Sequence, residues 1–186
     1  MVVDSIRQMT VEEYFAFDEA SEYKNEYIDG EVIPMTGGTV KHGELIMNTA
    51  FALMRRLMGN DCKVYGGHVR HSVSPTRYLY PDVSVVCGAL ETDERSVNLF
   101  NPVLVAEVTS PSTSDYDRGE KLRYYQSIES LQAILVIDQE EAQVEVDARG
   151  ASGWQTQAYT GLDAVVPLPA LDSELPLAEI YHGVEI

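Results

Sequence analysis

The spacing of apolar residues predicts three helices. The longest should run from His42 to Met58, because apolar side chains recur there every three or four residues. Thr10 and Glu13 have the spacing of a capping box, which predicts a short helix ending near Ala20. A third amphipathic segment is expected over Ser114–Ser127. A last helical turn is expected near the C-terminus, over Leu177–Tyr181.

Short apolar or alternating runs between turn residues predict strands. Asp29-Gly30 is a strong hairpin signal between Glu26–Ile28 and Glu31–Ile33. Six further strands are expected at Val64–Tyr65, Val69–Val73, Asp82–Val86, Val103–Val108, Ala133–Ile137 and Gln143–Asp147. The order of helices and strands suits one mixed β-sheet flanked by helices, in the α/β or α+β class. The chain shows no internal repeat or linker, so we expect a single domain over residues 1–186.

Charge is unevenly distributed along a strongly acidic chain. The 186 residues carry a formal net charge of −17, which in general disfavours contact with nucleic acid or anionic membranes. The span Lys41–Arg77 is locally basic, with six bases against two acids. The simplest interpretation of this span is a set of solvated surface charges; the alternative is a surface that contacts a phosphate backbone.

Cysteine usage and hydropathy indicate the cytoplasm. No segment approaches the roughly 20 apolar residues of a membrane span, and the first ten residues lack the pattern of a signal peptide. Cys62 and Cys87 lie in separate apolar stretches without CxxC spacing, so we expect two buried, reduced thiols and no cysteine-type zinc site. No membrane partner is expected.

Two acidic residues fall where strands should be buried. Asp82 begins one apolar strand and Glu107 lies near the end of another. Carboxylates are rarely buried unless they are paired or bind a metal, and a cation such as Mg²⁺ prefers oxygen ligands. The alternative is structural, with Asp82 capping the turn after Pro81 and Glu107 facing solvent.

Lys121 and Glu31 are two further candidates, and His42 is a weaker one. Lys121 lies on the helix that follows the Glu107 strand, and it can either approach the two carboxylates or simply pair with Asp117 at i, i+4. Glu31 is a possible third acid or a surface charge of the hairpin. His42 is a possible ligand or acid–base group, although without HExxH-type spacing a hydrogen-bonding role is favoured.

Five motifs resemble those of the Uma2 family and follow one another in that family's order. The Uma2 family is placed in the PD-(D/E)XK restriction-endonuclease-like superfamily. The motifs are Tyr27–Val32, Lys41–Ile46, Tyr80–Val86, Val105–Thr113 and Asp117–Tyr125. The resemblance extends from about Thr10 to Tyr181. It implies a restriction-endonuclease-like core, with a mixed central sheet and a metal-dependent nuclease site.

The resemblance assigns roles to residues of this chain. Pro81-Asp82 matches the PD element and Glu107 matches the acid of the (D/E)XK element. Thr109 occupies the usual lysine position, and Lys121 is the matching residue on the following helix. Glu31 would be the extra acid from the N-terminal part of the core.

The implied ligands of Mg²⁺ (or Mn²⁺) are Asp82, Glu107 and the backbone carbonyl of Val108. The resemblance thus implies a Mg²⁺-dependent endonuclease that hydrolyses phosphodiester bonds of DNA. A homodimer is attractive, because two sites related by two-fold symmetry most simply cut both strands of a duplex. Two alternatives remain open: a catalytically silent nuclease-fold protein that acts as a homodimeric interaction or nucleic-acid-binding module, and a nuclease that acts on RNA or a branched structure.

Overall fold

Two sheets and a separate hairpin carry the fold. The computed structural model describes residues 8–35, 37–109 and 117–186. The larger sheet has six strands in the order β11 (Gly153–Thr160), β10 (Gln143–Gly150), β9 (Ala133–Asp138), β8 (Leu104–Thr109), β6 (Val83–Cys87) and β3 (Cys62–Gly66). It is mixed, because β8 and β9 are parallel while its other neighbours are antiparallel.

The smaller sheet lies beside the N-terminal helix. It has five strands in the order β2 (Glu31–Pro34), β1 (Asn25–Ile28), β5 (Arg77–Leu79), β4 (Arg70–Ser74) and β7 (Asn98–Leu99). A third, two-stranded element pairs β12 (Val165–Leu168) with β13 (Ser173–Pro176). The expectation of one sheet was therefore too simple, because the pattern of a strand does not specify its partner.

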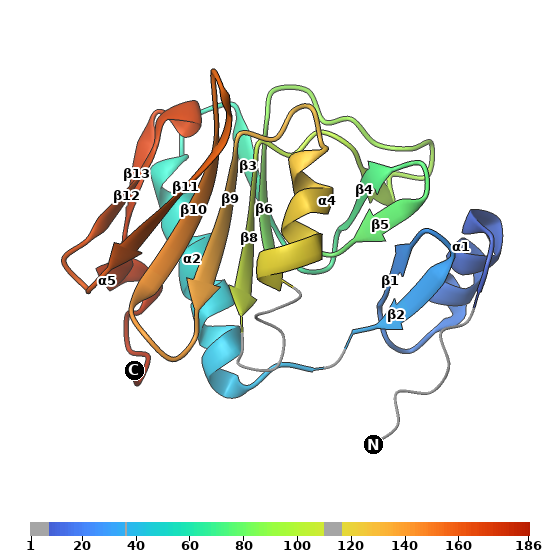
Figure 1. Cartoon of the computed structure of the whole chain (residues 1–186), viewed down its shortest axis with the longest axis horizontal. Helices are drawn as coiled ribbons and strands as arrows, with labels where there is room; N and C mark the ends of the chain where they lie inside the picture. Colours follow the sequence, from blue (N-terminus) through green and yellow to red (C-terminus); the bar gives the residue numbers. More distant parts are fainter. Residues whose placement is uncertain (1–7, 36, 110–116) are drawn as a thin grey trace.

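The helices cover the six-stranded sheet from both sides. Figure 1 shows α2 (Val40–Arg56) behind this sheet and α4 (Leu122–Gln126) in front of it. A π-helical turn, η1 (Asp117–Lys121), leads into α4. The other helices are α1 (Val11–Ala20), the short 3₁₀ turn η2 (Pro169–Leu171) and α5 (Leu177–Ile180). This is the mixed α+β class that the sequence predicts, with a mixed sheet flanked by helices.

Strand β8 divides the core into two parts. Leu104, Ala106 and Val108 belong to the cluster that includes the buried face of α2. Val105 points to the opposite side, into the cluster that includes Tyr125 of α4. Because side chains alternate along a strand, Glu107 lies on the same side as Val105, facing α4.

Local signals in the sequence correspond closely to local structure. The capping box is present, with Thr10 accepting from the backbone of Glu13 and the Glu13 carboxylate accepting from Thr10 N. The hairpin turn has φ of 50° at Asp29 and 106° at Gly30, the left-handed conformations that a two-residue turn of this kind requires. Helix α2 begins two residues before the expected start, because the side chain of Thr39 caps it.

Two further expectations differ from the structure. The expected helix over Ser114–Ser127 is observed as η1 followed by α4, and its residues 114–116 lie outside the described residues. Cys62 and Cys87 are not reduced thiols: they form a disulfide, because the antiparallel register of β3 and β6 places them directly opposite each other. Among the described residues, no helix combines the length and apolar character needed to cross a membrane.

Candidate active site

Asp82 and Glu107 lie opposite each other at one end of β6 and β8. The register pairs Val83 with Ala106, and one further step along both strands sets Asp82 opposite Glu107. The Val108 N–H donates to Asp82 Oδ2 at 2.8 Å, which holds this carboxylate against β8. The side chains of Asp82 and Glu107 are 14% and 7% exposed. The two acids therefore converge from segments that are distant in the sequence.

The ammonium of Lys121 lies between two buried carboxylates. Lys121 Nζ is 3.0 Å from Glu107 Oε1 and 3.1 Å from Glu26 Oε1. The lysine ends η1, which runs over the face of β8 from which Glu107 projects. Because its side chain is only 7% exposed, these ion pairs are poorly screened by solvent.

Glu26 is the acid that sequence reasoning did not single out. It belongs to β1, a strand of the smaller sheet whose four residues are all buried. Its carboxylate also accepts from Tyr80 N at 3.2 Å, so it is fixed on two sides. The available signal was an acid two positions before the apolar Ile28, on the same face of a predicted strand.

Glu31 lies at the other end of the same hairpin. It pairs with Ile28 across the turn, whereas Glu26 pairs with Ile33. The two glutamates therefore share one face of the hairpin as diagonal neighbours. Glu31 is partly exposed, while Glu26 is buried and forms the ion pair with Lys121.

Tyr125 holds the carboxylate of Glu107, the second candidate metal ligand, in place. Its hydroxyl donates to Glu107 Oε1 at 2.5 Å, and the ring is 1% exposed. Burial, together with the negative charges of Glu107 and Glu26, raises the pKa of Tyr125 well above its ordinary value. The phenol therefore remains a neutral donor at any physiological pH. Its i, i+4 relation to Lys121 places both side chains on the face of the helical segment that covers β8.

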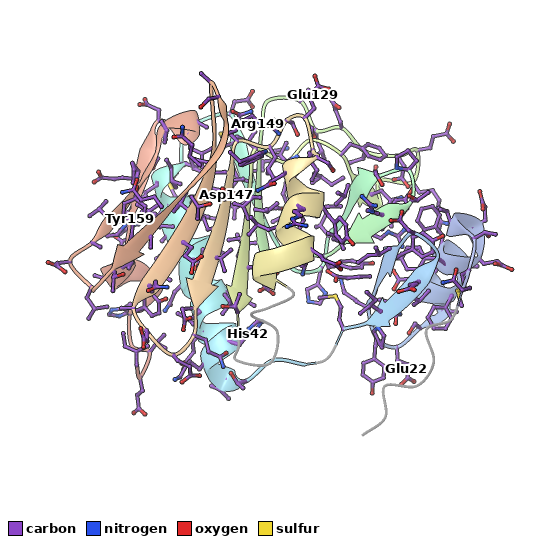
Figure 2. The ribbon with its side chains drawn as sticks, viewed as in Figure 1. Glu22, His42, Glu129, Asp147, Arg149 and Tyr159 are labelled. Atoms are coloured by element: carbon purple, nitrogen blue, oxygen red, sulfur yellow. A yellow bond between two sulfur atoms is a disulfide. The ribbon has the colours of Figure 1, made fainter. Side chains whose placement is uncertain are left out.

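His42 approaches the site from the other side of the sheet. It lies in the first turn of α2, where Thr39 Oγ1 accepts from its backbone N–H, and Figure 2 shows it at this end of the helix. His42 Nε2 is 3.5 Å from Asp82 Oδ1. The structure thus brings together Asp82, Glu107, Lys121 and His42 from the sequence-based candidates, and adds Glu26 and Tyr125.

The donor set fits a hard divalent cation. Within residues 8–35, 37–109 and 117–186, no group of three or more His, Cys, Asp or Glu side chains is arranged to hold a metal. Two carboxylates and a nearby main-chain carbonyl suit Mg²⁺, which is commonly bound by one or two carboxylates and keeps several waters. The Lys121 ammonium contacts the carboxylates of Glu26 and Glu107, and Asp82 lies opposite Glu107 on the neighbouring strand, so acids outnumber bases here and an additional cation would improve the local charge balance.

Comparison with known proteins places the chain in a family. The family model of Uma2, described as "Putative restriction endonuclease", matches residues 11–178. The chain belongs to the Uma2 family. Two uncharacterised proteins of Synechocystis sp. are similar to it. One, slr1290, is 30% identical over 180 residues, covering 95% of this chain and 93% of the relative. The other, sll1609, is 33% identical over 141 residues, covering 75% and 80%.

A solved structure shares the fold of this Uma2 chain. It is a crystal structure from Anabaena variabilis, described as a "putative nuclease belonging to DUF820". The two superpose with a TM-score of 0.77 over 93% of this chain and 97% of the other, at 20% sequence identity. The family and the restriction-endonuclease-like fold class that the motifs predict are therefore confirmed.

Proposed function

We propose that this Uma2 protein is a divalent-metal-dependent endonuclease that hydrolyses phosphodiester bonds of DNA. The observation that carries the proposal is that Asp82, just before β6, lies opposite Glu107 of β8, while Lys121 of η1 contacts Glu107. Family membership and the shared fold support the same class of activity. We further propose that the protein acts as a homodimer. The expected cytoplasmic location loses the support of reduced cysteines, because Cys62 and Cys87 form a disulfide.

The residues of the site divide into ligands and positioning groups. Asp82, Glu107 and the Val108 carbonyl would hold Mg²⁺ or Mn²⁺. Such an ion, when bound, polarises the scissile phosphate and lowers the pKa of a coordinated water. Lys121 carries the positive charge that offsets negative charge developing on the phosphate. Glu26 and Tyr125 are positioning residues, because they hold the Lys121 ammonium and the Glu107 carboxylate in place.

Lys121 replaces the lysine that the motif usually carries on the strand. Thr109 stands in that position; it is 2% exposed, and its hydroxyl lies 3.4 Å from the Ile137 carbonyl. The long side chain of Lys121 reaches Glu107 from the neighbouring helical segment instead. Because the lysine side chain is long and flexible, an ammonium that comes from the helical segment can take the same chemical role as one that comes from the strand.

The basic span does not supply a free positive surface. Five of its six basic residues are in ion pairs with acids of the same chain: Lys41, Arg55, Arg56, Arg70 and Arg77. Binding of a phosphate backbone would therefore depend on the cation at the site more than on this span. The same observation favours the second candidate function, a catalytically silent homodimeric or nucleic-acid-binding module.

Cleavage assays with matched variants separate the candidates. We expect the wild type to cleave supercoiled or linear DNA with Mg²⁺ or Mn²⁺, and to be inactive with EDTA. Glu107→Gln and Asp82→Asn should lower the rate by at least about 10²-fold. Glu129→Gln, at an exposed acid far from the site, should leave the rate unchanged.

Two results would count against the proposal. Equal cleavage by the Asp82→Asn/Glu107→Gln variant and the wild type would place the activity elsewhere. Calorimetry should show a single Mn²⁺ binding event that this double variant loses, and unchanged binding would remove the metal site. Absence of cleavage on DNA, RNA and branched substrates, with retained metal binding, would instead favour the silent module.

A further inference from the structure

Helix α2 exposes a ridge of apolar side chains. Its inner face is buried against the sheet through Leu45, Thr49, Ala52 and Leu53. Its outer face carries Val40, Met47, Phe51, Met54 and, just past its C-terminus, Met58, which are 81%, 68%, 66%, 56% and 81% exposed. Single exposed apolar residues are normal, but a contiguous row of large ones marks an interaction surface.

The spacing of the ridge is that of a helix–helix seam. From Met47 to Met58 the apolar positions are separated by four, three and four residues. This alternation is the a/d pattern through which two helices pack side by side. Methionine, which supplies three of the four residues, is common at binding surfaces because its side chain adapts to its partner.

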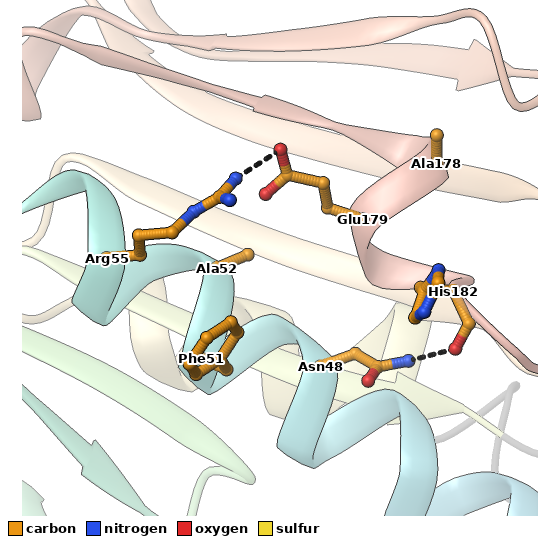
Figure 3. A pocket seen from close by; sticks show the side chains of 7 residues that line it. All are labelled: Asn48, Phe51, Ala52, Arg55, Ala178, Glu179 and His182. Atoms are coloured by element: carbon orange, nitrogen blue, oxygen red, sulfur yellow. Dashed lines mark hydrogen bonds and ion pairs between the residues drawn. The ribbon is translucent and has the colours of Figure 1, made fainter.

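Hollows flank the ridge on both sides. One has a volume of about 290 Å³ and lies between α2 and α5, where Phe51 stands at its edge beside Asn48 and His182 (Figure 3). The other, of about 460 Å³, lies between the C-terminal end of α2 and β3, and is lined by Met54, Met58 and neighbours. A ridge between two hollows is complementary to a second copy of itself, as a two-fold interface requires.

The charges on the outer face favour an antiparallel arrangement. Among residues 43–58, the two exposed charged side chains are Glu44, near the start of α2, and Arg55, near its end. Arg55 pairs with Glu179 but keeps 55% of its side chain exposed. Antiparallel helices bring the acid of each copy to the base of the other, whereas parallel helices would place like charges together.

We infer that two copies of this chain dock through α2 in antiparallel orientation, about a two-fold axis that crosses the ridge midway between Met47 and Phe51. In this register four of the five apolar ridge residues meet the partner's ridge, because Val40 faces the partner's Met58 and Met47 faces the partner's Phe51. Glu44 lies beside the partner's Met54 and the partner's Arg55. The inference names the surface of the homodimer within the proposed function, and its readout is molecular mass, so its failure is distinguishable from loss of nuclease activity.

The register also places the two candidate sites. His42 marks the site end of α2, and it would lie opposite position 56 of the other copy. The 14-residue offset corresponds to about 21 Å between the two His42 positions along the helix pair. Both sites therefore stay clear of the ridge and are related by two-fold symmetry.

Sedimentation velocity on the full chain tests the interface. We expect the wild type to dimerise at micromolar concentration. Phe51→Glu should weaken dimerisation by at least about 10²-fold, because it buries a charge against the partner's Met47. The matched control is Leu162→Glu, at a residue that is 50% exposed in the loop between β11 and β12 and is not part of the ridge, and it should dimerise like the wild type. Circular dichroism should show unchanged folding for both variants.

A mixing experiment tests the register. Met47→Lys and Phe51→Glu should each be monomeric alone, and an equimolar mixture should form a heterodimer, because the two altered positions face each other. A monomeric wild type up to about 100 µM would overturn the inference and leave the ridge to another partner. A wild-type-like dimer of Phe51→Glu would also overturn it, and failure of the mixture to associate would refute the antiparallel register.

Discussion

Replacing Lys121 with methionine tests the electrostatics of the buried site directly. At contact distances of 3.0 and 3.1 Å, each ion pair has a gross attraction of about 5 kcal/mol at an effective dielectric constant near 20. Most of this attraction offsets the cost of removing three charges from water. The measurable loss in Lys121→Met is therefore the cost of leaving two buried carboxylates without the ammonium between them, about 3–5 kcal/mol in the free energy of unfolding.

A second substitution should restore part of the lost stability. Lys121→Met leaves Glu26 and Glu107 facing the vacated volume, and Glu26→Gln removes one of these two charges while keeping its hydrogen bond from Tyr80 N. The remaining Glu107 carboxylate still accepts from Tyr125. The double variant should accordingly be at least about 1 kcal/mol more stable than Lys121→Met, in clear departure from additivity.

Urea denaturation at pH 7.5 measures both effects. Arg123→Met, at an exposed residue of α4, serves as the matched control and should change stability by less than about 0.5 kcal/mol. A Lys121→Met variant within 1 kcal/mol of the wild type, or a strictly additive double variant, would refute the buried three-charge arrangement.

Three other predictions concern stability. Burial lowers the pKa of His71 from 6.5 to about 4, so as the pH falls the unfolded chain takes up the proton before the folded chain does. The free energy of unfolding should therefore fall by about 3 kcal/mol between pH 6.5 and pH 4. In a pH series of denaturation curves, His71→Gln should flatten this dependence. Cys62→Ser/Cys87→Ser removes a cross-link between positions 25 residues apart and should cost about 3 kcal/mol, whereas an unchanged urea midpoint would contradict a role for the disulfide. Thr10→Ala removes the side-chain half of the capping box and should lower stability by about 1 kcal/mol, which a thermal melt would detect.

The features that the sequence predicts well depend on neighbours in the chain. The capping box, the Asp29-Gly30 turn and the amphipathic α2 each follow from residues within one or two helical turns or one hairpin. The division of the strands into two sheets does not follow from neighbouring residues. Strands β5 and β7 are only three and two residues long, and they are recognisable as strands only by the partners with which they pair. The Cys62–Cys87 disulfide could not be predicted for the same reason, because it depends on the pairing of β3 with β6.

The candidate site follows the same division. Motif order is enough to associate Asp82, Glu107 and Lys121, and the structure places Glu107 in contact with Lys121 and beside Asp82. Glu26 and Tyr125 were not identified as site residues, since their significance lies in three-dimensional contacts with side chains that are 95 and 18 residues away. A buried acid within a predicted strand, and an aromatic residue one helical turn after the lysine, were the available signals.

The acidity of the chain and the geometry of the site can be reconciled by where the positive charge is placed. The bases of the central span are held by acids such as Glu179, Asp18 and Asp29, which leaves little positive potential at the surface. The buried cluster, by contrast, combines three carboxylates with the single ammonium of Lys121. Binding of a divalent cation there would cancel the net charge of about −2 that these groups carry, at the place where the proposed activity brings a phosphate. Metal dependence would then govern substrate binding as well as chemistry, and a net charge of −17 would act against binding of nucleic acid elsewhere on the surface.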